Sequence, residues 1–268
     1  MTRELLFEKL WKNYTDQNPS VQKVYNSFTE LNETVLNDHI AFRTFNDPRM
    51  NISVLEKPFL EAGYVEKGQY NFEAKKLFAK HYEVPGKPEE PKVFISQLLV
   101  EEFSEELQKL IKERINSINN ITYQNKDLIF KGNVWGKPSY TVYNRLREES
   151  EYAAWLYVYG FCSNHFTVSI NSLKTLNSIE KVNQHLKDKG FKMNTSGGEI
   201  KGTKEELLQQ SSIMAEKVQI EFTEGTYEIP ACYYEFAIRY EDKTGKLYNG
   251  FIAKSADKIF ESTNFYKK

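Results

Sequence analysis

A pair of matched strand patterns constrains the fold of this chain more than any other feature. Residues 37–43 (NDHIAFR) and residues 164–168 (NHFTV) each place Asn or Asp before a histidine, followed by residues that alternate between the two faces of a strand. The chain has four histidines, and two of them, His39 and His165, begin these strands. Related features follow each strand in the same order, so the sequence predicts an internal duplication.

The first copy predicts a βαβββ module over residues 37–100. Its helix covers residues 53–62 and ends at Gly63, a residue that suits a helix C-terminal cap. Apolar and polar residues then alternate in three further segments, which predict strands at about residues 64–72, 76–84 and 92–100.

The second copy predicts another βαβββ module, together with a C-terminal segment, over residues 161–268. Its helix covers residues 172–189 and ends at Gly190, as the first helix ends at Gly63. Its last strand covers residues 232–240, an apolar and aromatic run that contains one carboxylate, Glu235.

A further match supports the duplication and predicts where the copies differ. Residues 82–85 (YEVP) near the end of the first module correspond to residues 227–230 (YEIP) in the second. Because the second copy is longer, we expect residues 197–212 to hold its insertion.

The remaining segments are predicted to be helical and to pack against the two modules. Residues 1–36 carry apolar residues at helical spacing, and residues 101–160 connect the modules through helices, including a long one over residues 140–159. This connection is too apolar for a flexible linker, so we expect one domain over residues 1–268. The predicted fold class is α+β: two pseudo-symmetric βαβββ modules form a half-open barrel around a metal site, with extra helices at the N-terminus and between the modules.

Composition excludes several classes of protein. The net charge of -1 and pI near 6.5 provide no basic field, which argues against nucleic acid as a partner. We expect no membrane span, because no run of about 18 apolar residues occurs. The N-terminus lacks the apolar core of a signal peptide, and two cysteines, Cys162 and Cys232, are too few for a disulfide framework. A cytoplasmic protein is expected, and its oligomeric state is left open.

Three polar residues are candidates for one metal site. In a barrel of two such modules, the first strand of each and the last strand of the second line the cleft, which places His39, His165 and Glu235 there. Two imidazoles and a carboxylate form the facial triad of Fe(II) oxygenases, but the same ligands also serve catalytic zinc. Two alternatives remain open: His81 is a rival ligand, and Glu235 is also placed for a salt bridge with Arg239.

Arg43 is a candidate substrate-binding residue. It lies four residues after His39, hence on the same face of the predicted strand, about 13 Å along it. From there its guanidinium can bind the far carboxylate of a dicarboxylic substrate whose other end chelates the metal. An ordinary ion pair with a neighbouring acid is the alternative.

At these residues the sequence resembles the 2-oxoadipate dioxygenase/decarboxylase (2-hydroxyglutarate synthase) family, whose fold is similar to that of the vicinal oxygen chelate enzymes. The resemblance extends from about residue 30 to residue 264, and its motifs are DHIAFR at 38–43, ESEYAAW at 149–155, NHFTVS at 164–169, Glu235-Phe236 and SADKIF at 255–260.

The resemblance implies an Fe(II) site formed by His39, His165 and Glu235, with Arg43 holding the substrate. It also implies a substrate contact through Ser255, although Lys254 stands where the family has a valine. The implied substrates are a small-molecule 2-oxo acid and O₂. The implied reaction converts 2-oxoadipate to 2-hydroxyglutarate and CO₂, a step of lysine catabolism.

Two other functions remain open at this point. One is a different metalloenzyme of the vicinal oxygen chelate type, either a metal-dependent isomerase or a ring-cleaving dioxygenase. The other is a metal-free protein that uses the same cleft to bind a ligand.

Overall fold

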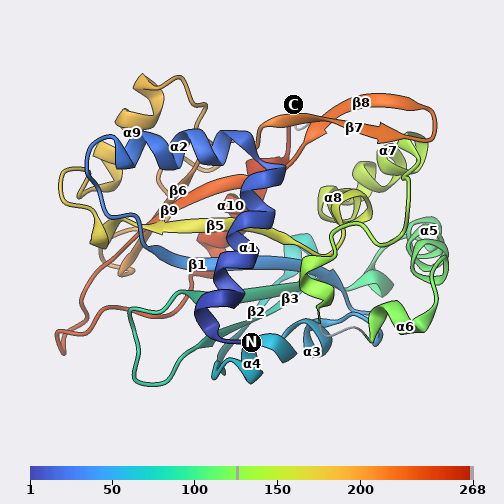
Figure 1. Ribbon diagram of the computed structural model, residues 1–268, viewed down its shortest axis with the longest axis horizontal. Helices are drawn as coiled ribbons and strands as arrows, with labels where there is room; N and C mark the ends of the chain where they lie inside the picture. Colours follow the sequence, from blue (N-terminus) through green and yellow to red (C-terminus); the bar gives the residue numbers. More distant parts are fainter. Residues whose placement is uncertain (125–126, 266–268) are drawn as a thin grey trace.

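The computed structural model describes residues 1–124 and 127–265, and a seven-stranded sheet forms its centre (Figure 1). The order of the strands across this sheet is β2-β3-β4-β1-β5-β9-β6. Their bounds are β1 (Asn37–Phe45), β2 (Val65–Phe72), β3 (Leu77–Glu83), β4 (Lys92–Leu98), β5 (Ser163–Ser169), β6 (Leu208–Ser212) and β9 (Tyr233–Arg239).

The two modules meet at the duplicated strands. β1 pairs with β5 in antiparallel orientation, whereas within each module the first strand pairs in parallel with the last, β1 with β4 and β5 with β9. Both central strands are buried along nearly their whole length. The matched strands of the sequence therefore lie side by side at the middle of the sheet.

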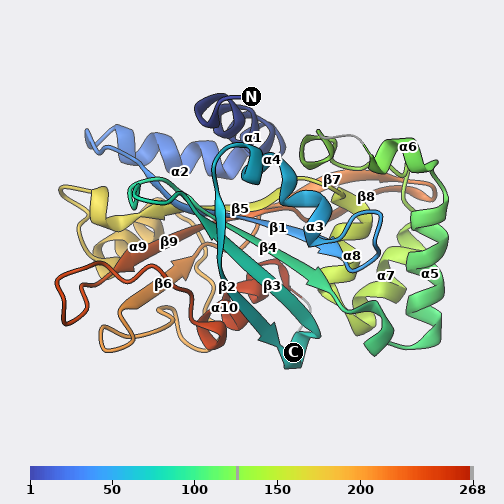
Figure 2. The ribbon, with the colours of Figure 1, turned by 90° about the horizontal axis from the view of Figure 1, so that it is seen from below.

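The sheet curls into a half-barrel that α10 (Ala253–Ile259) crosses. This helix contacts both β2 and β6, the two edge strands of the sheet. The N-terminal helices α1 (Arg3–Gln17) and α2 (Pro19–Thr29) lie on the opposite side (Figure 2), and they bury Leu10 and Phe28 there. The predicted α+β half-barrel is confirmed.

The second module departs from the prediction in the position of its insertion. β7 (Lys217–Phe222) and β8 (Gly225–Pro230) form a separate hairpin. The YEVP motif ends β3, which pairs with β4, but the YEIP motif ends β8, and it is β6 that pairs with β9. The predicted equivalence of residues 82–85 and 227–230 is therefore wrong, and so is an insertion confined to residues 197–212. Half of the residues in each hairpin strand are exposed, because the hairpin is separate from the sheet. Tyr227 of β8 stacks on Tyr140 with the ring centroids 3.7 Å apart.

Three predicted helices differ from the structure, two of them because a serine caps a helix. The helix expected over residues 53–62 is divided at Glu56 into α3 (Ile52–Leu55) and α4 (Lys57–Glu61). The helix expected over residues 140–159 is two, α7 (Tyr140–Glu149) and α8 (Glu151–Tyr159), because Ser150 is extended and its hydroxyl accepts a hydrogen bond from the Ala153 N–H. The helix expected over residues 172–189 is the shorter α9 (Ile179–Asp188), which Ser178 caps in the same way.

The remaining helices and 3₁₀ turns surround these elements. They are α5 (Glu105–Asn116), α6 (Asn120–Tyr123), and the 3₁₀ turns η1 (Glu73–Lys75), η2 (Val100–Glu102), η3 (Leu128–Phe130), η4 (Ile170–Ser172) and η5 (Phe260–Thr263). In the part of the chain that the structure describes, no helix combines the length and apolarity that crossing a bilayer requires.

Candidate metal centre

Three adjacent strands bring the predicted ligands together. His39 is on β1, His165 on β5 and Glu235 on β9, and these strands are neighbours in the sheet. Thr167 is opposite both His39 and Glu235 in the strand register, while His165 is two residues away on the same face. All three ligand side chains are buried, so they form a cluster inside the half-barrel.

The ligand atoms converge on one point. His165 Nε2 lies 3.1 Å from Glu235 Oε2, His39 Nε2 lies 3.6 Å from Glu235 Oε1, and the two Nε2 atoms are 3.4 Å apart. A candidate ligand atom from each residue lies within 4.8 Å of the other two. At this spacing two imidazoles and one carboxylate could bind one side of a single ion, as the donor set of a facial triad does.

His39 is oriented by a buried ion pair. Its Nδ1 lies 2.8 Å from Asp38 Oδ1, and Arg239 donates to both oxygens of Asp38 at 2.6 and 2.9 Å. A proton on Nδ1 donated to Asp38 leaves the Nε2 lone pair directed at the cluster. Burial raises the pKa of the Asp38 carboxyl, but the attraction of Arg239 and the His39 hydrogen bond outweigh it and hold that pKa well below its usual range.

The same contacts settle the alternative for Glu235. Arg239 pairs with Asp38, so its salt bridge with Glu235 is not formed. Glu235 Oε1 instead accepts a hydrogen bond from Gln210 Nε2 at 2.5 Å. Its second oxygen faces His165, and no Lys or Arg forms an ion pair with Glu235 among the described residues.

Burial disfavours charge on all three ligands. It raises the pKa of Glu235 to about 8, and it lowers the pKa of His39 and, further, that of His165. His165 Nδ1 has no hydrogen-bond partner among the described residues. A divalent cation among these atoms would stabilise the carboxylate and use the neutral imidazoles as donors.

The cavity at the cluster is small. Its volume is about 20 Å³, enough for one molecule the size of water. Besides the three ligands it is lined by Gln210 and by five residues with apolar side chains: Phe94, Phe251, Ala256, Ile259 and Phe260. The last three belong to α10 and η5, so the C-terminal segment covers the ligand cluster.

Arg43 is buried close to this cavity and is incompletely hydrogen-bonded. Its Nη1 lies 3.4 Å from Glu151 and its Nη2 3.3 Å from Thr263, and within the described residues its Nε has no partner. The guanidinium lies over the rings of Tyr152 at 4.9 Å and Trp155 at 5.0 Å. The ion pair with an acid, which was the alternative for Arg43, is present as the long contact with Glu151. It leaves the Nε donor of Arg43 without a hydrogen bond among the described residues.

Two other residues considered from the sequence, Ser255 and His81, do not line the ligand cavity. Ser255 is buried on α10, but its neighbour Ala256 lines the ligand cavity and Ser255 does not. His81 hydrogen-bonds Tyr70 at 2.9 Å and Glu83 at 3.0 Å, and it is not part of the ligand cluster. The role proposed for Ser255 stays a prediction.

Three site residues were not predicted from the sequence. Thr167, whose hydroxyl lies 3.1 Å from His39 Nε2, could have been found from its place two residues after His165. Asp38 could have been found as the acid next to His39. Gln210 gave no signal, because the register of β6 against β9 depends on a strand pairing that the sequence did not reveal.

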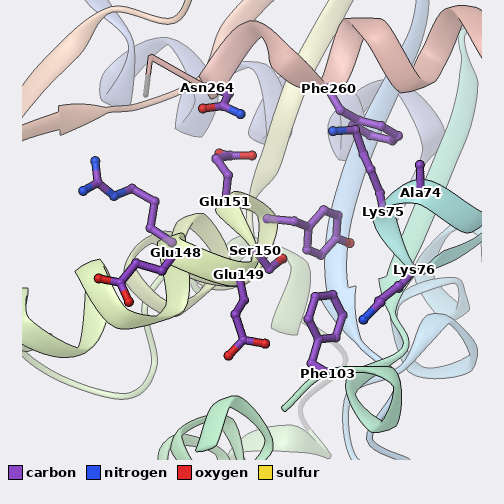
Figure 3. A pocket seen from close by; sticks show the side chains of 12 residues that line it. Ala74, Lys75, Lys76, Phe103, Glu148, Glu149, Ser150, Glu151, Phe260 and Asn264 are labelled. Carbon is purple, nitrogen blue, oxygen red and sulfur yellow. The ribbon is translucent and has the colours of Figure 1, made fainter. Parts of the chain in front are cut away.

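A second, larger pocket lies beyond the ligand cavity (Figure 3). Its volume is about 640 Å³, and its lining includes charged residues of both signs from the η1 region and the end of α7. Glu151 and Phe260, which Figure 3 shows at its wall, both contact Arg43.

Comparisons with known proteins identify the family of the chain. The profile of a family described as 2-oxoadipate dioxygenase/decarboxylase matches residues 6–246. The chloroplastic 2-oxoadipate dioxygenase/decarboxylase of Arabidopsis thaliana is 37% identical over 236 residues, which cover 79% of this chain and 64% of the relative. The chain thus spans slightly less than two thirds of the length of this curated relative.

Solved structures show the same similarity. The hydroxyglutarate synthase of Oryza sativa, in complex with 2-oxoadipate, is 34% identical with a TM-score of 0.88, covering 97% of this chain and 91% of that one. A Shewanella frigidimarina protein provisionally described as a hydrolase is 50% identical with a TM-score of 0.87, covering 93% and 97%.

A protein of lower sequence identity has the same fold. A Ralstonia eutropha protein provisionally placed in the glyoxalase superfamily is 19% identical with a TM-score of 0.72, covering 90% of this chain and 83% of that one, and shares the fold alone. The resemblance predicted from the sequence motifs is confirmed by the family match and by the curated relative. The chain therefore belongs to the 2-oxoadipate dioxygenase/decarboxylase family.

Proposed function

We propose that this chain is an Fe(II)-dependent dioxygenase that oxidatively decarboxylates a 2-oxo acid, with 2-oxoadipate as substrate and 2-hydroxyglutarate and CO₂ as products. The observation that carries the proposal is the buried cluster of His39, His165 and Glu235 next to an incompletely hydrogen-bonded Arg43, in a chain of this family. A role in lysine catabolism is part of the same proposal.

The three ligands fit a divalent metal. Glu235 is buried without a Lys or Arg partner in the described chain, an arrangement that is costly for a carboxylate unless it binds a cation. His39 is held by Asp38 in the orientation that suits a ligand. Donor chemistry does not separate iron from zinc, but the name of the family, a dioxygenase, favours iron.

Bound Fe(II) would supply the redox chemistry that O₂ needs to react with a 2-oxo acid, and the protein's own residues would hold and orient the substrate. Arg43 has the donors to bind the far carboxylate of a diacid, and its Nε has no partner among the described residues. Burial of Arg43 strengthens that pairing. Phe94 and Phe251 limit water at the centre.

The reaction is balanced without another reductant. One oxygen atom of O₂ enters the new carboxylate formed as CO₂ leaves, and the other becomes the hydroxyl group of the product. The 2-oxo acid supplies the electrons, so O₂ consumed and CO₂ released should be equal in amount.

The test is turnover by protein loaded anaerobically with Fe(II). Given 2-oxoadipate and then O₂, the wild type should consume O₂ and release CO₂ in equal amounts, and His39→Ala should not. His81→Ala is the matched control, because His81 is a buried histidine outside the cluster. Full turnover by His39→Ala, or turnover by zinc-loaded protein under nitrogen, would contradict the proposal.

We also propose a reducing compartment, the cytoplasm, as the site of action. Cys162 and Cys232 are both buried and unpaired as disulfides, as is usual for proteins of such compartments. Fractionation of cells that produce the protein would test this.

A further inference from the structure

Phe260 separates the ligand cavity from the larger pocket. Of the residues that the structure describes, it is the one that lines both spaces. Its side chain is 5% exposed, and its ring packs edge-on against Phe72 at 5.4 Å. Glu261, the next residue, forms an ion pair with Lys75, which ties η5 to the turn before β3. Phe260 is thus a fixed part of the wall between the two spaces.

Arg43 lies at the same boundary. Its guanidinium carbon is 6.0 Å from the centre of the Phe260 ring, and two of its other contacts, Glu151 and Tyr152, line the larger pocket. Consider a diacid whose oxo-acid end lies at the ligand cluster and whose far carboxylate binds Arg43. This acid ends next to the Phe260 ring. A longer chain would have to pass through the position of the Phe260 ring.

The two spaces that Phe260 separates differ greatly in volume. The ligand cavity of about 20 Å³ is smaller than a six-carbon diacid, so other side chains that line it must move when the acid binds, whereas Phe260 is held by Phe72 and by the ion pair of its neighbour Glu261. The pocket behind Phe260 measures about 640 Å³. That pocket also holds cationic side chains, Lys75 and Lys76, which Figure 3 shows on the same side as Phe260. Loss of the ring would join the two spaces and add room beyond Arg43, in a pocket whose lining carries charges of both signs.

We propose that Phe260 sets the length of the 2-oxo diacid that this site accepts, by closing the ligand cavity at the level of Arg43. The substrate named here rests on the proposed function. In a shaped apolar site each methylene changes kcat/KM by roughly 10- to 200-fold. The wild type should therefore lose at least about tenfold in kcat/KM when one methylene is added to the six-carbon diacid.

The first test compares Phe260→Ala with the wild type on 2-oxo diacids of six carbons and of one to three more. The ratio of kcat/KM for the longer acids to that for the six-carbon acid should rise at least about tenfold in Phe260→Ala. Phe260→Leu keeps an apolar wall and should stay near the wild type. Phe103→Ala removes a ring from the far side of the larger pocket and should leave the ratio unchanged. An unchanged ratio in Phe260→Ala, or an equal shift in Phe103→Ala, overturns the inference.

The second test does not depend on turnover. The rate at which a chelator removes metal from loaded protein should rise at least about tenfold in Phe260→Ala, because the opened wall exposes the centre, and should not rise in Phe103→Ala. Equal rates in all variants overturn the inference. If the wild type turns over no 2-oxo acid while Phe260→Ala still releases metal faster, the proposed function fails and the position of the wall stands.

Discussion

Replacing Glu235 with glutamine should stabilise the metal-free protein at alkaline pH even though it removes a metal ligand. The side chain is 1% exposed, and glutamine has nearly the same shape and keeps the oxygen that accepts the Gln210 hydrogen bond. Glutamine differs in carrying no ionisable proton. The substitution therefore isolates the cost of a buried carboxylate that has no cation.

The size of the effect follows from the two pKa values of Glu235. Its ordinary pKa is 4.5, and burial raises the folded-state pKa to about 8. Between these values the unfolded chain holds fewer protons than the folded chain, so the free energy of unfolding falls by about 1.4 kcal/mol per pH unit. The stabilising contribution of the neutral carboxyl is fully present below pH 4.5 and is lost as pH rises towards 8. From pH 5 to pH 8 the loss amounts to about 3 to 4 kcal/mol.

The assay is urea unfolding of chelator-treated wild type and Glu235→Gln at pH 5 and pH 8. His39 and His165 titrate in both proteins, so comparing the two removes most of their contribution. The stability of the variant relative to the wild type should increase by about 3 to 4 kcal/mol between the two pH values. A difference that stays constant within about 1 kcal/mol would refute the reasoning, because it would mean that folded Glu235 ionises normally. Added divalent metal should stabilise the wild type and not the variant.

Three further outcomes are expected. Arg43→Ala should lower kcat/KM for 2-oxoadipate about 10- to 100-fold through loss of a charged hydrogen bond, with metal content by elemental analysis unchanged; equal activity would contradict the role of Arg43. Asp38→Ala should lower the free energy of unfolding by about 3 to 5 kcal/mol, because it leaves Arg239 buried and unpaired, and metal affinity measured by competition with a chelator should fall about 10- to 100-fold. Gly160→Ala should lower the melting temperature, because a Cβ there would lie 2.2 Å from the Gly132 carbonyl oxygen at a backbone φ of +65°; an unchanged thermal scan would contradict that clash.

Much of the fold and the candidate ligand set could be predicted from the sequence. The alternation of β1 and β5 is local, since side chains two residues apart share a face of a strand. Duplication predicted that these strands share one site, and a carboxylate within an apolar strand marked Glu235 as a residue that needs a cation or a proton. These inferences depend on neighbouring residues along the chain, which the sequence displays directly.

The tertiary structure decided the remaining features because they depend on residues far apart in the chain. Two similar motifs, YEVP and YEIP, lie in different environments, since β6 and not β8 supplies the strand beside β9. Arg239 finds its partner in Asp38, 201 residues away, and not in Glu235. The closing of the ligand cavity by Phe260 required α10 to cross from one edge of the sheet to the other. Local patterns determine which residues face a cleft, but long-range pairing and packing determine which of them meet and how much space they leave.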